Sequence, residues 1–151
     1  MIDITHNHPS LRFPTRETFR ALQCVLQHES VQSIQLSVVF VGSRFIRRVN
    51  RTFLHHDYVT DVIAFPLGDG AQSSGEGEIY VNLDRAKSQA REYGVSFAEE
   101  TRRLLIHGTL HLLGYDDSGA REKARMTRRE DLLLARLAVT KKERDNARTN
   151  R

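Results

Sequence analysis

The sequence predicts a single-domain α/β (α+β) layer sandwich, with a mixed sheet of about four strands and about five helices. A length of 151 residues is typical of one domain. Short runs rich in β-branched and aromatic residues alternate with longer segments whose apolar residues recur at helical spacing. The sequence contains no internal repeat. We therefore expect one layered core, in a strand order that the sequence does not reveal.

The first half of the chain is expected to alternate strands and helices. Ile34–Val41 is β-branched and aromatic and ends at a glycine, which is typical of a strand. A helical apolar period follows Thr15, which we interpret as a helix N-cap, and Ser43 is expected to cap a short second helix. The other strands expected in this half are Ile2–Thr5 and Val62–Phe65, the latter closed by Pro66.

A loop rich in glycine and serine, Leu67–Gly77, leads into the second half. The elements predicted after it are a strand at Glu78–Asn82, a helix at about Leu83–Tyr93 stopped by Gly94, a helix from the capping box Ser96-Phe-Ala-Glu99 through Leu113, and a last helix from about Gly119 to Val139. Residues 141–151 have no apolar period. We expect them to form a basic disordered tail, which places the folded domain at residues 1–140.

Composition excludes several classes of protein. Seven Phe and four Tyr exclude a wholly disordered chain, and no apolar run approaches the roughly 18 residues of a membrane span. The N-terminal segment lacks the basic and apolar regions of a signal peptide. The single cysteine, Cys24, forms no internal disulfide and no cysteine-based metal site, so the expected location is the reducing cytoplasm.

The segment HGTLHLLGYDD at 107–117 carries the strongest functional signal. His107 and His111 are four residues apart, so on a helix they share one face and their imidazoles converge on one ion. Gly114 is placed to end the helix, and Asp117 would present an oxygen to the same ion. This spacing matches three-ligand zinc sites of the metzincin type, which keep a position open for water. The alternative is a histidine pair with a structural or surface role, because such pairs also arise by chance.

Gly108 narrows the chemistry of this segment. Zinc proteases of this layout carry a glutamate as general base directly after the first histidine, and Gly108 holds that position. Peptide hydrolysis by that mechanism is therefore not expected, whereas a metal-bound water would still attack a phosphodiester. A glycine inside a helix costs about 1 kcal/mol relative to alanine. Gly108 thus indicates either a close backbone approach or tight packing against a neighbouring helix.

The same segment closely resembles the H-G-x-L-H-L-x-G-Y-D-H signature of the YbeY family, the metal-dependent endoribonucleases of ribosomal RNA maturation. Further stretches are similar to that family, so the resemblance covers residues 1–138. These stretches are Asn50 with TDVIAFP at 60–66, GEIYV at 77–81 and the Met126…Glu130 helix.

The resemblance implies a cytoplasmic, single-strand-specific endoribonuclease that acts in small-subunit rRNA 3′ end processing and in ribosome quality control. Its partners would be single-stranded rRNA and the small ribosomal subunit, and binding to DNA or to a membrane is not expected. His107 and His111 would act in catalysis through one Zn²⁺, which they would bind together with Asp117. The family has a histidine where this chain has Asp117. A carboxylate binds zinc, but its charge makes the ion a weaker Lewis acid and shifts the preference modestly toward harder metals such as Mn²⁺.

A second departure from the family is Leu54, which stands where the family usually has an arginine that contacts RNA phosphate. Arg51, His55 and His56 are the nearby candidates for substrate binding, although an ordinary polar loop explains the two histidines at least as well. The two departures motivate an alternative function. In it, the protein is a ribosome- or RNA-binding assembly factor with a structural metal and little nuclease activity.

The net charge of +4 is distributed unevenly. Residues 1–118 hold 12 Lys and Arg against 14 Asp and Glu, whereas residues 119–151 hold 11 against 5. The basic excess therefore lies in the last helix and the tail. Arg121 and its basic neighbours in that helix are expected to guide RNA phosphate toward the ion, although a solvated helix face is the commoner origin of such charges.

Overall fold

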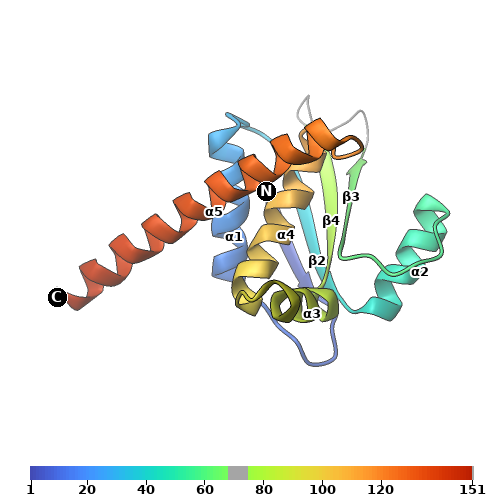
Figure 1. The fold of residues 1–151 in the computed structure, drawn as a ribbon, viewed down its shortest axis with the longest axis horizontal. Coiled ribbons are helices and arrows are strands. Elements are labelled where there is room, and N and C mark those ends of the chain that lie inside the picture. The colour runs from blue at the N-terminus through green and yellow to red at the C-terminus, as the bar shows by residue number, and fades with distance from the viewer. Residues whose placement is uncertain (68–74, 151) are drawn as a thin grey trace.

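The predicted α/β layer sandwich is confirmed (Figure 1). The computed structural model describes residues 1–67 and 75–150, and the described chain forms four strands and five helices. In chain order these are β1 (Ile2–His6), α1 (Thr15–His28), β2 (Gln35–Val41), α2 (Ser43–Leu54), β3 (Val62–Leu67), β4 (Glu76–Asn82), α3 (Leu83–Tyr93), α4 (Phe97–Leu112) and α5 (Ala120–Thr149). No helix of the described chain is both long and apolar enough to cross a membrane.

The sheet is mixed, with the strand order β1-β2-β4-β3. β1, β2 and β4 are parallel, and β3 pairs antiparallel with β4 at one edge. Val38 of β2 is in register with Ile79 of β4, which in turn faces Ala64 of β3. Because β4 enters the sheet between β2 and β3, the pairing depends on contacts that are distant along the chain.

The two faces of the sheet are covered by different helices (Figure 1). Val38 and Phe40 of β2 point into the main core, which they share with α1, α3 and α4. Val41 points to the opposite face, where α2 packs through Ile46 and Val49. Helix α5 forms an outer layer, because its buried side chains pack on α1 and α4 rather than on the sheet. Helix α4 therefore lies between the sheet and α5.

Gly108 brings α4 close to the sheet. A Cβ atom at this position would lie 2.9 Å from Cγ2 of Ile79 and 3.2 Å from Cγ2 of Val62. The absence of a side chain is therefore what allows the helix backbone to approach β3 and β4. The close approach expected at Gly108 is present, and the neighbour is the sheet rather than another helix. It places the segment with His107 and His111 beside the edge strand β3.

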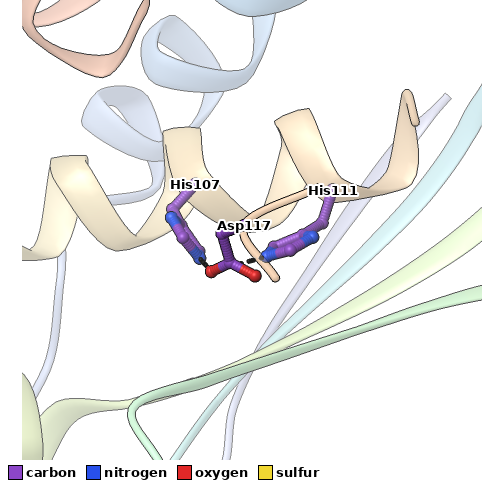
Figure 2. A group of neighbouring side chains, drawn as sticks. All are labelled: His107, His111 and Asp117. Carbon is purple, nitrogen blue, oxygen red and sulfur yellow. Dashed lines mark ion pairs between the residues drawn. The ribbon is translucent and has the colours of Figure 1, made fainter. Parts of the chain in front are cut away.

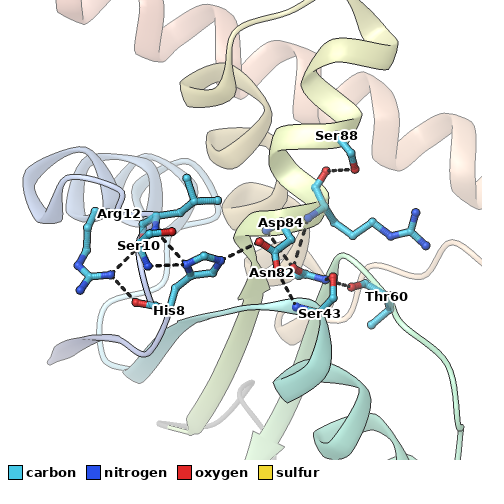
Figure 3. Close-up of polar contacts among 10 residues, drawn as sticks. His8, Ser10, Arg12, Ser43, Thr60, Asn82, Asp84 and Ser88 are labelled. Carbon is cyan, nitrogen blue, oxygen red and sulfur yellow. Dashed lines mark hydrogen bonds and ion pairs between the residues drawn. The ribbon is translucent and has the colours of Figure 1, made fainter.

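A polar network ties together the loops at the carboxyl ends of the parallel strands (Figure 3). Nδ1 of the buried His8 accepts hydrogen bonds from two backbone N–H groups, which leaves Nε2–H to donate to Asp84 Oδ1 at 2.8 Å. The buried Asn82 caps α3 with its Oδ1 and donates from Nδ2 to the Thr60 carbonyl at 3.0 Å and to Ser43 Oγ at 3.1 Å. These bonds hold the residues just before β3, and so fix the position of this edge strand beside α4.

Two predicted helix caps are wrong. Pro14 and Gly42 are the N-cap residues of α1 and α2, and Thr15 and Ser43 are the first helical residues. At α2 the cap is supplied from elsewhere in the chain, because the Ser43 N–H donates to Asp84 Oδ2 at 2.9 Å. Such a distant acceptor leaves no local sequence signal. By contrast, the predicted cap of α4 by Ser96 and the predicted stop of α3 at Gly94 are both present.

The end of α5 also differs from the prediction. The helix continues to Thr149, so residues 141–149 are helical instead of forming the expected disordered tail. The segment contains neither glycine nor proline, and Lys, Glu, Arg and Ala extend an existing helix readily without any apolar period. Figure 1 shows this end of α5 projecting beyond the other helices. Of the predicted loop Leu67–Gly77, residues 68–74 lie outside the described part of the chain, and β4 begins at Glu76.

Candidate metal centre

Three polar side chains converge at the end of α4 (Figure 2). His107 and His111 lie on successive turns of α4, and Asp117 lies in the loop that leads to α5. Asp117 Oδ2 is 3.5 Å from His107 Nε2 and 3.4 Å from His111 Nε2, and the three ligand atoms all lie within 4.8 Å of one another. The structure thus brings together the three residues that the sequence predicts as metal ligands.

The turn after α4 returns the chain toward the two histidines. Gly114 has φ +100°, a value that favours glycine, and its N–H donates to the His111 carbonyl at 3.1 Å. The Tyr115 N–H donates to the Leu110 carbonyl at 3.0 Å, which completes the helix end. The Asp116 carboxylate then accepts hydrogen bonds from the N–H and the Oγ–H of Ser118. Asp116 therefore shapes the turn, and its neighbour Asp117 faces the histidines.

Glu130 of α5 orients the His107 ring. Its buried Oε2 lies 2.7 Å from His107 Nδ1, and its Oε1 accepts from Arg103 Nη1 at 3.1 Å. Because a carboxylate only accepts, Nδ1 carries the proton and Nε2 presents its lone pair toward Asp117. A carboxylate behind a histidine in this way is the usual support of a metal ligand. Sequence reasoning placed Glu130 in a matching helix but assigned it no role.

The electrostatics of the site favour positive charge. Burial lowers the pKa of His107, but the hydrogen bond and charge of Glu130, with Asp117 and Asp61, outweigh it and raise the pKa above its ordinary value. A field that stabilises an imidazolium also stabilises a cation held by neutral imidazoles. Because the pKa of His107 is raised, a proton competes with a metal ion for His107 Nε2.

The donor set fits a zinc ion. Two imidazole nitrogens and one carboxylate oxygen are ligands that Zn²⁺ accepts, at about 2.0–2.2 Å each. Tetrahedral ligands at that distance are separated by about 3.3–3.5 Å, and the Nε2–Oδ2 distances are 3.4 and 3.5 Å. Three protein ligands leave a fourth position for water or substrate. The type of donor and the two distances to Asp117 therefore fit an open zinc site.

A second buried carboxyl group, which sequence reasoning missed, lies two turns before His107 on α4. Glu100 is only 3% exposed, and burial, opposed by Arg103 and reinforced by Asp61 and Glu130, raises its pKa to about 7. Glu100 follows the capping-box residue Glu99 in the first turn of α4, where a charged residue gives no sequence signal of burial.

The residues predicted to bind substrate lie outside the three-residue cluster. Arg51 is exposed in the last turn of α2, His55 ends that helix in the left-handed conformation (φ +58°), and His56 stacks on Tyr58 with ring centroids 5.4 Å apart. Arg121 is exposed in the first turn of α5. Among the described residues, no hydrogen bond or ion pair joins these four side chains to the cluster.

Two basic neighbours of Arg121 in α5, and Asn50 of α2, have defined structural contacts. The guanidinium groups of Arg125 and Arg129 lie 5.2 and 5.9 Å from the centre of the Tyr115 ring, and Arg129 also pairs with Glu29. The buried Asn50 donates to the Tyr58 carbonyl at 3.1 Å and so holds the loop that carries His55 and His56.

Comparison with known proteins places this chain among relatives of similar length. The family model described as endoribonuclease YbeY matches residues 4–138. The endoribonuclease YbeY of Chlorobaculum parvum is 44% identical over 117 residues, which cover 78% of this chain and 82% of the relative. Those of Chlorobium luteolum and Salinibacter ruber are 40% and 39% identical, and the matches cover 87% and 88% of this chain and 95% and 89% of the relatives.

A solved structure shares the fold. The solution structure of a Thermotoga maritima protein superposes with a TM-score of 0.60 at 24% identity, and the match covers 93% of each chain. The sequence matches cover most of this chain and most of each relative, and the signature at 107–117 lies inside the region that the family model matches. This chain therefore belongs to the endoribonuclease YbeY family.

Proposed function

We propose that the protein is a cytoplasmic, single-strand-specific, metal-dependent endoribonuclease that acts in small-subunit rRNA 3′ end processing and ribosome quality control. Membership of the endoribonuclease YbeY family supports the reaction class. The observation that carries the metal dependence is the convergence of three ligand atoms, in which Asp117 Oδ2 lies 3.5 Å from His107 Nε2 and 3.4 Å from His111 Nε2. In this proposal the three residues hold one Zn²⁺, or another divalent ion, and the RNA is the ribosomal substrate.

The chain positions this site in three ways. Glu130 holds His107 in the tautomer whose Nε2 is a ligand. Gly108 lets α4 approach β3 and β4, which brings the helix segment that carries both histidines close to the sheet. Asp117 adds a negative charge that offsets the charge of a divalent ion. A bound Zn²⁺ would supply a Lewis acid for the phosphoryl oxygens and lower the pKa of a water molecule.

RNA contacts are proposed for Arg51, His55, His56 and Arg121. All four are exposed, and Arg51 and Arg121 are cations able to pair with phosphate. Near the end of α2, the exposed rings of Phe53 and Tyr58 offer faces for stacking on unpaired bases, which favours a single-stranded substrate.

The test combines metal analysis with RNA cleavage. Wild-type protein should contain one divalent ion per chain and cut single-stranded RNA but not a duplex of the same sequence. His111→Ala should lose both the ion and the cleavage, whereas Arg91→Ala, an exposed change on α3, should retain both. Equal cleavage by wild type and His111→Ala in protein of equal melting temperature contradicts the proposal.

A second candidate function is an RNA- or ribosome-binding assembly factor with a structural metal. It is favoured by Leu54, which is 39% exposed where the family usually presents an arginine, and by Asp117 in the ligand set. A leucine makes no bidentate bond to phosphate. Single-turnover cleavage with rigorously purified protein separates the two functions, because robust metal-dependent cutting removes the assembly-factor alternative.

A further inference from the structure

A groove of about 620 Å³ lies between α1 and the second half of α5. It uses a side of α5 different from that of the metal centre: Leu132, Arg136 and Val139 line the groove, whereas Glu130 points to His107 on α4. Helix α1 contributes Arg20 to its other wall. The groove therefore belongs to neither the zinc ligands nor the residues proposed to bind RNA.

The charged residues that line this groove are all arginines. Arg20, Arg136 and Arg144 line it, and none of the described lining residues is acidic. Burial lowers the pKa of Arg20, and the nearby charges of Arg144, Arg16 and Arg148 lower it further, against a smaller opposing effect of Glu17. Cations that repel one another in this way are stabilised by an anionic ligand.

Arg144 adds a hydrogen-bond donor without a partner. Its Nε is buried and, within the described part of the chain, has no hydrogen-bond partner. A buried donor that is left unpaired costs about 1–3 kcal/mol, and the residue that carries this donor is one of those that line the groove. Carboxylates are well suited as acceptors, because guanidinium groups pair with them through two parallel bonds.

The remaining lining is apolar but not aromatic. Leu132 is 44% exposed and Val139 is 58% exposed, and both are large apolar side chains on the surface of α5. The groove contains no aromatic ring among its described lining residues, so it offers no stacking partner for RNA bases. Arginines that flank aliphatic side chains are instead typical of protein interfaces and of grooves that accept an amphipathic helix.

We propose that the α1–α5 groove docks an acidic amphipathic segment of a partner protein. Its aliphatic side chains pack on Leu132 and Val139, and its carboxylates pair with Arg20, Arg136 and Arg144. The interaction is independent of the nuclease reaction, because the metal centre remains open when the groove is filled.

Cys24 supplies a built-in reporter, because the only cysteine of the chain lines this groove. The probe is a synthetic helical peptide of about 20 residues, with leucines along one face and glutamates on the other. A peptide of the same composition in scrambled order and a single-stranded poly-U oligonucleotide are the comparisons. The rate of Cys24 alkylation is measured with and without each probe, and labelled peptide is titrated by fluorescence anisotropy.

The amphipathic peptide should slow Cys24 alkylation, and the scrambled peptide should not. Arg136→Glu and Val139→Asp, both at exposed positions, should each weaken peptide binding by about tenfold or more. Arg91→Glu on α3 is the matched charge reversal and should leave binding unchanged. The proposal is overturned if the peptide leaves Cys24 unprotected, if Arg91→Glu weakens binding as much as Arg136→Glu, or if poly-U protects Cys24 and the peptide does not.

Discussion

Replacement of Glu130 by glutamine tests how the chain prepares its metal centre. The buried carboxylate accepts from His107 Nδ1 at 2.7 Å and from Arg103 at 3.1 Å. A glutamine side chain at this position would keep the volume and one acceptor oxygen but lose the negative charge. We expect Glu130→Gln to fold, because Arg103 keeps its bond to Asp131 at 2.8 Å.

The expected loss is in zinc affinity. Removal of a carboxylate behind a ligand histidine typically weakens metal binding by about 10- to 100-fold, which corresponds to about 1.4–2.7 kcal/mol. The same change removes the main influence that raises the pKa of His107, so this pKa should fall in the metal-free protein. A histidine whose pKa is raised by folding stabilises the protein below its ordinary pKa, where it is protonated, and this stabilisation is lost as the pH rises through the raised value. Because the variant lacks this stabilisation, its free energy of unfolding should fall mainly at acidic pH.

Zinc affinity is measured by competition with a chromophoric chelator, and the His107 pKa by NMR titration of the metal-free protein. Asp131→Asn is the matched control, since Asp131 also pairs with Arg103 but is exposed and does not contact His107. It should retain wild-type zinc affinity. If Glu130→Gln binds zinc as tightly as wild type and leaves the His107 pKa unchanged, the orienting role of Glu130 is refuted.

Three further predictions concern α4 and its loop. Glu100→Gln should raise the free energy of unfolding by up to about 3 kcal/mol above about pH 7 and change it little below pH 4.5, because the raised pKa of Glu100 makes its ionisation unfavourable in the fold. Denaturant titrations at several pH values measure this effect, and an effect of equal size at all pH values contradicts the prediction. Gly108→Ala should lower the melting temperature, because overpacking against Ile79 and Val62 costs up to about 3 kcal/mol whereas helix propensity gains only about 1 kcal/mol; a more stable variant would show that the sheet yields freely. Asp117→His should tighten zinc binding and Asp117→Ala should weaken it strongly, as measured by chelator competition; equal affinities of all three proteins would remove Asp117 from the ligand set.

Local patterns predicted much of the fold. β-Branched runs located β2 and β3, a glycine located the end of α3, and a serine located the start of α4. Features that depend on distant residues were not accessible in this way. The strand order requires β4 to enter between β2 and β3, and the cap of α2 comes from Asp84, 41 residues after Ser43. The continuation of α5 to Thr149 was not predicted, because this segment has no apolar residues at helical spacing.

The candidate site shows the same division. His107 and His111 are one helical turn apart, and Gly114 ends the helix, so the approach of Asp117 follows from local spacing. The support by Glu130 arises from the packing of α5 on α4, 23 residues later in the chain. The roles of Arg51, His55, His56 and Arg121 in substrate binding remain predictions, because an RNA path depends on surfaces that no local spacing defines.

The most direct test of the account is a zinc titration of the metal-free protein with cleavage of single-stranded RNA as the readout. We predict no cleavage without metal, a rise that saturates at one zinc ion per chain, and no rise for His111→Ala at the same zinc concentrations. Cleavage by metal-free wild type, or equal restoration in His111→Ala, would contradict the claim that His107, His111 and Asp117 hold the catalytic ion.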